Sequence, residues 1–357
     1  MMSKRMPDKP SAGRVLRDRR RRTLLAEVIP RLQADGALSR EETLVREMVE
    51  TSLRLLTSGI GLGEIKLLNA ALRELRYAFK VFAPYRGVRK VSAFGSARTP
   101  PDAPAYRTAA EFARAIAEHG WMMITGGGNG IMRACQEGAS RERSFGVNIR
   151  LPWEQEANEF ILNDPKLVTF RYFFTRKLMF IKEADAVVLF PGGFGTLDEG
   201  FEALTLAQTG KSHPMPIVFL DVPQGTYWEA WRCYIEEHLV RRDLISPEDM
   251  ALFKVTTSVD EAVREITTFY RVYHSSRWVG DRFVIRMNRA LAPELVETLA
   301  REFEPIVLEG GMEQRGPLDE EREQEPELDT LPRLVFAARR GSFGLRRQLI
   351  DRLNREG

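Results

Sequence analysis

The sequence predicts an α/β fold built on a doubly wound parallel sheet, and three observations lead to this class. From Arg89 onward, short apolar runs alternate with amphipathic segments of helical length, which is the order of strand–helix–strand units. The runs are apolar throughout, as expected of strands that are buried on both faces. Several runs end in glycine-rich turns that lead directly into a helical pattern. Right-handed crossovers then place helices on both faces of the sheet.

Six strands and six helices are expected in this part of the chain, from the apolar runs and the spacing of apolar residues. The strands are expected near residues 90–95, 121–125, 145–150, 186–190, 215–220 and 252–256. The helices are expected near residues 103–119, 130–140, 172–184, 197–208, 226–240 and 258–273.

Two segments precede this alternation. Residues 1–22 are basic and include four consecutive arginines, which indicates a solvated arm rather than a nucleic-acid contact. Residues 23–87 carry leucines near helical spacing, among them Leu68 and Leu72, with a break around Gly61. We expect a helical extension there that covers the core or a partner subunit.

The last part of the chain, residues 276–357, predicts a small β-α-β-α appendage. Its strands are expected near 282–287 and 334–338, and its helices near 293–303 and 344–354. Residues 310–332 are rich in Glu, Asp, Pro and Gly, which favours a flexible acidic loop. We expect the appendage to cover a sheet edge or to support oligomerisation.

Composition narrows the class of protein. The chain has 357 residues, of which 43% are hydrophobic and 29% are charged, as in ordinary globular proteins. Its net charge of +3 is too small to indicate nucleic-acid binding. Cys135 and Cys233 indicate buried thiols in a reducing compartment, and neither a signal peptide nor a membrane span is visible. We therefore expect a cytoplasmic protein without a metal site, because its histidines are scattered singly.

The most informative segment is residues 186–200, AVVLFPGGFGTLDEG. A buried strand ends in a proline and three glycines, Gly192, Gly193 and Gly195, and a helix opens near Thr196. Backbone N–H groups at such a turn form a site for phosphate. The glycines fit a tight structural turn equally well, and Thr196 fits a helix N-cap.

Two further segments have the same design, WMMITGGGNGIM at 121–132 and VSAFGSAR at 91–98. Neither contains a full G-x-G-x-x-G motif or a P-loop. Because the carboxyl ends of parallel strands meet at one edge of a sheet, the three loops should converge on one crevice. We expect it to bind a nucleotide-sized anion, with Ser96, Gly128 and Asn129 completing the phosphate site.

The segment PGGFGTLDE at 191–199 resembles the PGGxGTxxE signature of the LOG (Lonely guy) family, phosphoribohydrolases of nucleoside 5′-monophosphates. FGSAR, ITGGGNGIMRA, GVNIRLPWEQEAN and FFTRKLMF precede it in the family's order, and the resemblance covers residues 88–270. It implies a modified Rossmann catalytic domain over residues 88–275 and a homodimer or larger assembly. The implied reaction, without a cofactor, releases the base and ribose 5-phosphate from a cytokinin riboside monophosphate or a purine nucleotide. Gly200 departs from the family pattern, in which a bulkier apolar residue commonly follows the glutamate.

Arg176 and Glu199 are the candidate catalytic residues. Arg176 belongs to a helix that is apolar almost all round, and a buried arginine needs an anionic partner. The resemblance maps both residues onto the family's catalytic arginine and glutamate. Glu199 should stabilise the positive charge that develops on the ribose and activate a water molecule. Arg176 should hold the ribose or phosphate and lower the pKa of Glu199.

Three other residues are weaker candidates for substrate contacts. Lys177 follows Arg176 but is turned by about 100° on the helix. Met179 lies three residues beyond Arg176 and suits the base pocket or the core equally well. Three sources stay open for the proton that the departing base takes up: Glu154, water, or another group that protonates the base on its ring.

Three other functions compete with hydrolysis. A non-catalytic carrier of a phosphorylated cofactor, such as the molybdenum cofactor, fits the glycine loops but does not need Glu199 beside a sugar carbon. A pyridoxal-phosphate decarboxylase needs a Schiff-base lysine, and the apolar strands offer none in an obvious position. A dinucleotide oxidoreductase lacks its glycine fingerprint.

Overall fold

The computed structural model describes residues 39–150, 156–322 and 325–357, together with Thr23 and Glu27. The chain forms two units, Met1–Arg73 and Glu74–Gly357. The basic arm expected at 1–22 and the candidate residue Glu154 lie outside the described residues.

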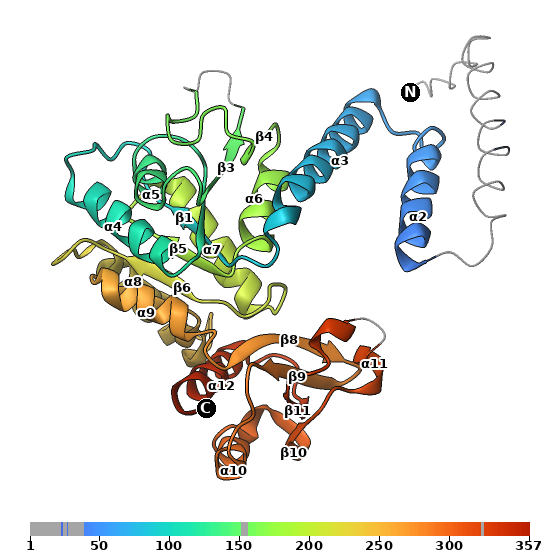
Figure 1. Ribbon diagram of the computed structural model, residues 1–357, viewed down its shortest axis with the longest axis vertical. Coiled ribbons are helices and arrows are strands. Elements are labelled where there is room, and N and C mark those ends of the chain that lie inside the picture. The colour runs from blue at the N-terminus through green and yellow to red at the C-terminus, as the bar shows by residue number, and fades with distance from the viewer. Residues whose placement is uncertain (1–22, 24–26, 28–38, 151–155, 323–324) are drawn as a thin grey trace, which may run out of the picture. The chain divides into compact units, whose positions relative to one another are not determined.

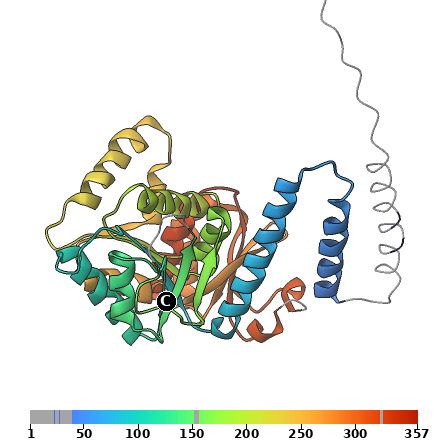
Figure 2. The ribbon, with the colours of Figure 1, turned by 90° about the horizontal axis from the view of Figure 1, so that it is seen from above.

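The described part of the first unit is helical, as expected of the N-terminal extension. Helix α2 (Arg40–Arg54) begins at a capping box in which Ser39 and Glu42 each accept a hydrogen bond from the other's backbone N–H. Helix α3 (Leu62–Phe82) starts in this unit and continues into the second. Both helices are drawn in blue in Figures 1 and 2. Large apolar side chains remain exposed on both: Leu44, Val45, Met48, Val49, Leu62, Leu67, Leu68 and Leu72.

The second unit is built on a parallel sheet of seven strands in the order β4-β3-β2-β1-β5-β6-β7. The strands are β1 (Lys90–Phe94), β2 (Met122–Thr125), β3 (Ser144–Ile149), β4 (Leu167–Phe170), β5 (Ala186–Leu189), β6 (Ile217–Leu220) and β7 (Lys254–Thr256). All neighbouring pairs are parallel. The six expected strands are confirmed, and β4 is an additional, half-exposed edge strand.

Helices cover both faces of this sheet, as the doubly wound class requires (Figure 1). Alternate strand residues face opposite layers: Val91 and Val188 belong to one core cluster, and Phe94 and Leu189 to the other. The first cluster contains side chains of α4 (Pro104–Glu118), α5 (Ile131–Ala139) and α9 (Val259–Thr268). The second contains side chains of the end of α3 and of α6 (Phe173–Lys182), α7 (Phe194–Gln208) and α8 (Tyr227–His238).

The C-terminal part forms a second sheet, antiparallel, in the order β10-β11-β9-β8. Its elements are β8 (Tyr273–Val279), β9 (Arg282–Met287), α10 (Pro293–Glu302), β10 (Val307–Arg315), α11 (Asp319–Arg322), β11 (Arg333–Ala338) and α12 (Phe343–Glu356). The sequence predicted β9, α10, β11 and α12. It missed β8 and β10, so the expected β-α-β-α order is corrected to two strands before each long helix.

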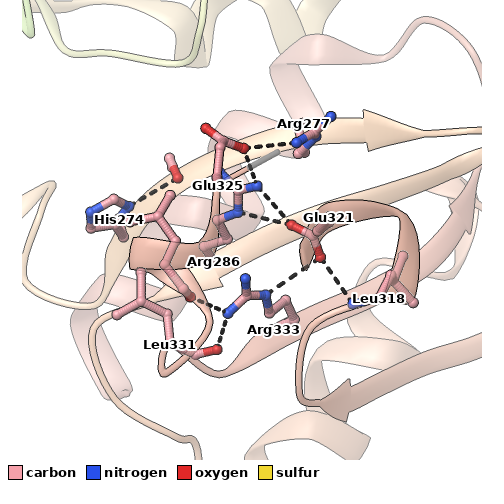
Figure 3. Close-up of polar contacts among 10 residues, drawn as sticks. His274, Arg277, Arg286, Leu318, Glu321, Glu325, Leu331 and Arg333 are labelled. Atoms are coloured by element: carbon pink, nitrogen blue, oxygen red, sulfur yellow. Dashed lines mark hydrogen bonds and ion pairs between the residues drawn. The ribbon is translucent and has the colours of Figure 1, made fainter. Parts of the chain in front are cut away.

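The expectation of a flexible acidic loop at 310–332 is also wrong for its described residues. The segment contains most of β10, the short helix α11 and a 3₁₀ turn at Pro326–Leu328. Glu321 is buried and accepts hydrogen bonds from Arg286, and it pairs with the buried Arg333, as Figure 3 shows. Glu325 pairs with Arg286 and Arg277. Composition suggested a solvated loop because it did not reveal that these acids have buried arginine partners.

Both cysteines are free thiols. Cys135 is buried on α5 as expected, but Cys233 is exposed on α8, which corrects the expectation of two buried thiols. Among the described helices, none combines the length and apolar character needed to cross a membrane.

Candidate active site

A cavity of about 800 Å³ opens at the carboxyl edge of the parallel sheet. It lies where the chain order reverses, because β1 is flanked by β2 on one side and by β5 on the other. Such a switch point is the usual ligand site in open α/β sheets. The cavity is lined by residues 93–98 and 192–199 and by Gly126, Met132, Phe173, Arg176 and Phe180.

The three glycine-rich loops converge here, which confirms the expectation of a shared crevice. Ser96 N–H donates to the carbonyl of Pro191 at 3.2 Å, and Ile131 N–H donates to the carbonyl of Ser96 at 3.0 Å. Gly192 permits this approach, because a Cβ there would lie 2.1 Å from Thr196 Oγ1. Gly130 has a φ of +63°, and its Cβ would lie 2.2 Å from Ser96 O. Both positions therefore require glycine.

Helix α7 begins earlier than the sequence suggested. Its N-cap is Gly193, and Phe194 is its first residue, so the alternative interpretation of Thr196 as the helix N-cap is wrong. Thr196 is buried in the first turn, where its N–H donates to the carbonyl of Gly193 at 3.0 Å. The first N–H groups of a helix lack intrahelical acceptors, so this end presents donors and a partial positive charge to the cavity.

Gly200 does not interrupt α7. It is buried, and a Cβ there would lie 2.8 Å from Leu189 Cδ2 on β5. The departure from the family pattern lets the helix pack closely on the strand that precedes it.

Arg176 lies on α6 and lines the cavity. Its Nε donates to the carbonyl of Val147 at 2.9 Å, and its guanidinium lies 5.3 Å from the ring centre of Phe180. Gly126 leaves room for the guanidinium, because a Cβ there would lie 2.6 Å from Nη2. The hydrogen bond to the backbone of Val147 and the contact with the Phe180 ring fix the orientation of the Arg176 guanidinium.

Glu199 lies on α7 and lines the same cavity, with 12% of its side chain exposed. Its Oε2 lies 3.3 Å from Lys177 Nζ. Burial raises the pKa of Glu199, because a buried carboxylate is poorly solvated. Lys177 and Arg176 both lower this pKa, Lys177 more strongly, but burial and the neighbouring Glu202 together outweigh the two cations, and the pKa stays above its ordinary value. Arg176 therefore acts in the expected direction, but the expectation of a low net pKa is corrected.

Lys177 faces carboxylates instead of the cavity. Its Nζ lies 2.6 Å from Glu202, 2.9 Å from Asp198 and 3.3 Å from Glu199, all on α7. Burial alone would lower the pKa of Lys177, but these three acids raise it above its usual value. The lysine thus joins α6 to α7 beside the candidate catalytic carboxylate.

The other predicted site residues divide into two groups. Ser96, Gly192, Gly193, Gly195 and Thr196 line the cavity. The remaining described residues, Gly128, Asn129 and Met179, are not among its lining residues.

Met179 is fully buried in the core that α6 shares with the sheet. Gly128 belongs to the loop after β2, which the buried Asn158 holds in place. The side-chain amide of Asn158 donates to the carbonyls of Gly127 at 3.1 Å and Gly128 at 2.7 Å.

Sequence reasoning missed several lining residues, among them Arg98, Phe173 and Phe194. Phe194 is 93% exposed, although it is a large apolar side chain at the mouth of a cavity. The sequence did offer a sign of this role, because Phe194 stands between the glycines of PGGFG, where an aromatic side chain is rarely part of the core. No cluster of metal-ligating side chains occurs among the described residues.

Comparisons with known proteins match part of the chain. A family model described as "Possible lysine decarboxylase" matches residues 130–266. A cytokinin riboside 5′-monophosphate phosphoribohydrolase of Mycobacterium tuberculosis is 31% identical over 176 residues, which cover 47% of this chain and 88% of that protein. The chain belongs to the LOG family.

Other LOG proteins align over shorter stretches. The phosphoribohydrolase of the same name from Mycobacterium marinum is 30% identical, in a match that covers 42% of this chain and 79% of that protein. Arabidopsis thaliana LOG1 is 33% identical over 26% of this chain and 42% of its own length.

A solved molybdenum cofactor binding protein from Rippkaea orientalis shares 18% identity. The match covers 50% of this chain and 94% of that protein, with a TM-score of 0.35. A likeness of this size carries no information on function.

Proposed function

We propose that this protein hydrolyses the N-ribosidic bond of a nucleoside 5′-monophosphate and releases the free base and ribose 5-phosphate. The observation that carries the proposal is that Arg176, Glu199 and the N-terminus of α7 line one cavity. The names of the LOG relatives, which describe phosphoribohydrolases, support the same reaction class.

The phosphate would bind where the loops after β1 and β5 meet. Gly193 and Gly195 at the start of α7 line the cavity without side chains that could block the approach of an anion. Ser96, on the facing loop, adds a hydroxyl group. Backbone donors at a helix N-terminus suit a phosphate dianion, because charge-assisted hydrogen bonds are about twice as strong as neutral ones.

Glu199 would act on the ribose. As the bond from C1′ to the base nitrogen breaks, its electron pair leaves with the base and positive charge develops on the sugar ring. A carboxylate next to C1′ stabilises that charge and accepts a proton from the attacking water, whose oxygen forms the new bond to C1′. The departing base takes up one proton, from Glu199 or from solvent water, which completes the free base and ribose 5-phosphate. The raised pKa of Glu199 makes it a stronger proton acceptor than an exposed glutamate.

Arg176 would hold the anionic part of the substrate. Its orientation is already fixed by Val147 and Phe180, so little side-chain entropy is lost on binding. The base would lie against two of the aromatic side chains that line the cavity, Phe173 and Phe194, which suits a planar purine.

A homodimer or larger assembly is part of the proposal. Aromatic and aliphatic side chains are exposed on α6 (Phe173, Phe174 and Leu178) and on α7 (Phe194 and Phe201). Apolar side chains gathered beside a cavity are typical of a protein interface. A second copy of the chain would bury them and close the cavity from the solvent.

The test of the proposed function is incubation with a panel of nucleoside 5′-monophosphates, with the free base followed by chromatography. The panel includes prenylated adenine, adenine, guanine and pyrimidine nucleotides, and the matching nucleosides serve as controls. Release of base together with an equal amount of ribose 5-phosphate is the expected result. Tight binding of a nucleotide without turnover would reject hydrolysis and favour the carrier function.

A further inference from the structure

A second cavity, of about 260 Å³, lies between the end of α7 and the C-terminal sheet. Its walls come from the turn after α7, from β8 and β9, and from the start of α12, all within the second unit. It shares no lining residue with the candidate active site. The proposed hydrolysis gives it no role.

The described lining of this cavity contains basic side chains and no acidic one. The basic groups are Lys211, Arg277, Arg346 and Arg347, and His213 lies among them. Arg347 is balanced by Glu265 and Asp351, and Arg277 pairs with Glu325. No carboxylate among the described residues pairs with Arg346.

Arg346 is the unusual member of this set. It is 1% exposed, and its guanidinium lies 4.5–5.0 Å from the ring centres of Phe343, Trp278 and Phe283. Nη2 donates to the carbonyl of Arg339, but Nε and Nη1 are buried without a hydrogen-bond partner. Burial lowers the pKa of Arg346 to about 10, so the group is charged at neutral pH. A buried cation with unmet donors is costly unless a ligand supplies the acceptor.

The turn after α7 adds further donors in a fixed geometry. Ser212 Oγ is buried without a partner, and Lys211 is exposed at the same cavity. Gly210, with a φ of +66°, packs so closely under Phe343 that a Cβ would lie 2.1 Å from its ring. This contact packs the backbone of the turn against α12, so the positions from which Ser212 and Lys211 extend are set before a ligand arrives.

We propose that this cavity binds a small phosphate-bearing anion between Arg346, Ser212 and Lys211. A guanidinium group with unmet donors, a hydroxyl group and an ammonium group together match a phosphate in charge and in hydrogen bonding. The volume lies below the ~300–1,000 Å³ typical of drug-sized ligands, which favours inorganic phosphate or a short phosphate ester over a nucleotide. Nε and Nη1 of Arg346 become accessible through a shift of the Trp278 ring, a side-chain change of the kind common on binding.

Trp278 provides a reporter of binding, because it lines this cavity and is absent from the lining of the first. It also lines a third cavity beside Arg282, so variants of the donor residues are needed to assign the signal to this site. The protein is labelled with 5-fluorotryptophan, and the fluorine NMR signal of Trp278 is assigned with Trp278→Phe. Inorganic phosphate and glycerol 3-phosphate are titrated separately at constant ionic strength, with chloride as the salt control. We expect a saturable shift of the Trp278 signal with at least one phosphate compound and none with chloride. The compound with the lower dissociation constant shows whether the natural ligand is free phosphate or a phosphate ester.

Three variants assign the site. Arg346→Met, Ser212→Ala and Lys211→Met each remove one donor group, and the loss of a charge-assisted bond should weaken binding about tenfold or more for the two cations. Lys80→Met, an exposed lysine outside the cavity, should leave the affinity unchanged. If Arg346→Met does not fold, Lys211→Met and Ser212→Ala decide the question. The absence of a saturable Trp278 shift, or unchanged affinity in these variants, would overturn the proposal.

Discussion

Lys177 Nζ lies 3.3 Å from Glu199 Oε2, so the candidate catalytic carboxylate is paired with the residue that follows Arg176. The two adjacent cations of α6, Arg176 and Lys177, therefore have different contacts. Arg176 lines the cavity, whereas Lys177 contacts three acids of α7. The pairing also links the protonation of Glu199 to a residue outside the cavity lining.

The first prediction separates catalysis from binding at Glu199. If this carboxylate stabilises charge that appears only in the transition state, Glu199→Gln should lower kcat about a hundredfold or more. The dissociation constant of a substrate analogue should change little. Turnover and analogue binding are measured on the same preparation. Glu229→Gln is the control, because Glu229 is an exposed carboxylate on α8 that does not line the cavity. Normal turnover by Glu199→Gln would reject the assignment.

The second prediction concerns pH. Lys177 opposes the rise in the pKa of Glu199 that burial causes, so Lys177→Met should raise this pKa further. A glutamate base works only when deprotonated, and its loss of activity on acidification follows its pKa. The acid limb of kcat/KM should therefore move to higher pH in Lys177→Met. Lys182→Met removes a lysine of the same helix that pairs with Glu183 and should leave the limb in place. A limb that moves to lower pH would contradict the role of Lys177.

The third prediction is that the 5′-phosphate is required. Each lost charge-assisted hydrogen bond is worth about 1.5–3 kcal/mol, so adenosine should be a poorer substrate than its monophosphate by orders of magnitude. Comparison of the two kcat/KM values tests this directly. Equal values would reject the phosphate site at α7.

Gly192 offers a structural test of the same phosphate site. In Gly192→Ala the new Cβ collides with Thr196 and lies 3.1 Å from Ser96 N, so the loops after β1 and β5 must separate. We expect a higher KM for nucleotides and a lower melting temperature. Gly87→Ala meets nothing within 4 Å and should change neither quantity.

The fourth prediction concerns the stability of the C-terminal sheet. Glu321→Gln leaves the buried Arg286 and Arg333 without the charge of their shared carboxylate (Figure 3). Breaking a buried ion pair typically costs about 3–5 kcal/mol, so the free energy of unfolding should fall by about that amount. Denaturant unfolding of the whole chain measures it. Glu320→Gln alters an exposed neighbour and should stay within about 0.5 kcal/mol of the wild type.

The pH dependence of unfolding checks the same carboxylate. Burial alone would raise the pKa of Glu321, but the hydrogen bond from Arg286 and the other cations hold it below its usual value. A lowered folded-state pKa stabilises the protein above the unfolded-state pKa, and this stability is lost as the pH falls through the folded-state value. The wild type should therefore lose stability under acid more steeply than Glu321→Gln. Identical slopes would contradict the assignment.

The fifth prediction concerns assembly. Sedimentation at micromolar concentration should show a dimer or larger species of the 40.8 kDa chain. Phe174→Asp places a charge on the exposed face of α6 and should favour monomers, because a buried unpaired charge is costly. Tyr234→Asp changes an equally exposed aromatic residue on α8 and serves as the control. A wild-type protein that sediments only as a monomer would rule out the proposed dimer.

The sequence alone indicated the parallel sheet and the convergence of the glycine loops. Strands such as β5 are short runs that are apolar at every position, and this local pattern is specific to burial on both faces. Gly130 and Gly192 could also be singled out from the sequence, because a glycine in a strand-to-helix turn indicates a position with no room for a side chain. Strand β4 escaped detection because only one face of this edge strand is fully buried.

Only the tertiary structure decided which charges meet. Helical geometry separated Arg176 from Lys177, but it could not show that Lys177 would lie against three acids of another helix. In the same way, acidic composition at 310–332 suggested a solvated loop, whereas Glu321 on α11 lies between two buried arginines, one on β9 and one on β11. Pairing of this kind joins residues that are distant in the chain, and it stabilises through Coulombic attraction in a desolvated site. No local pattern in the sequence encodes that attraction, because it depends on the distances and burial that folding creates.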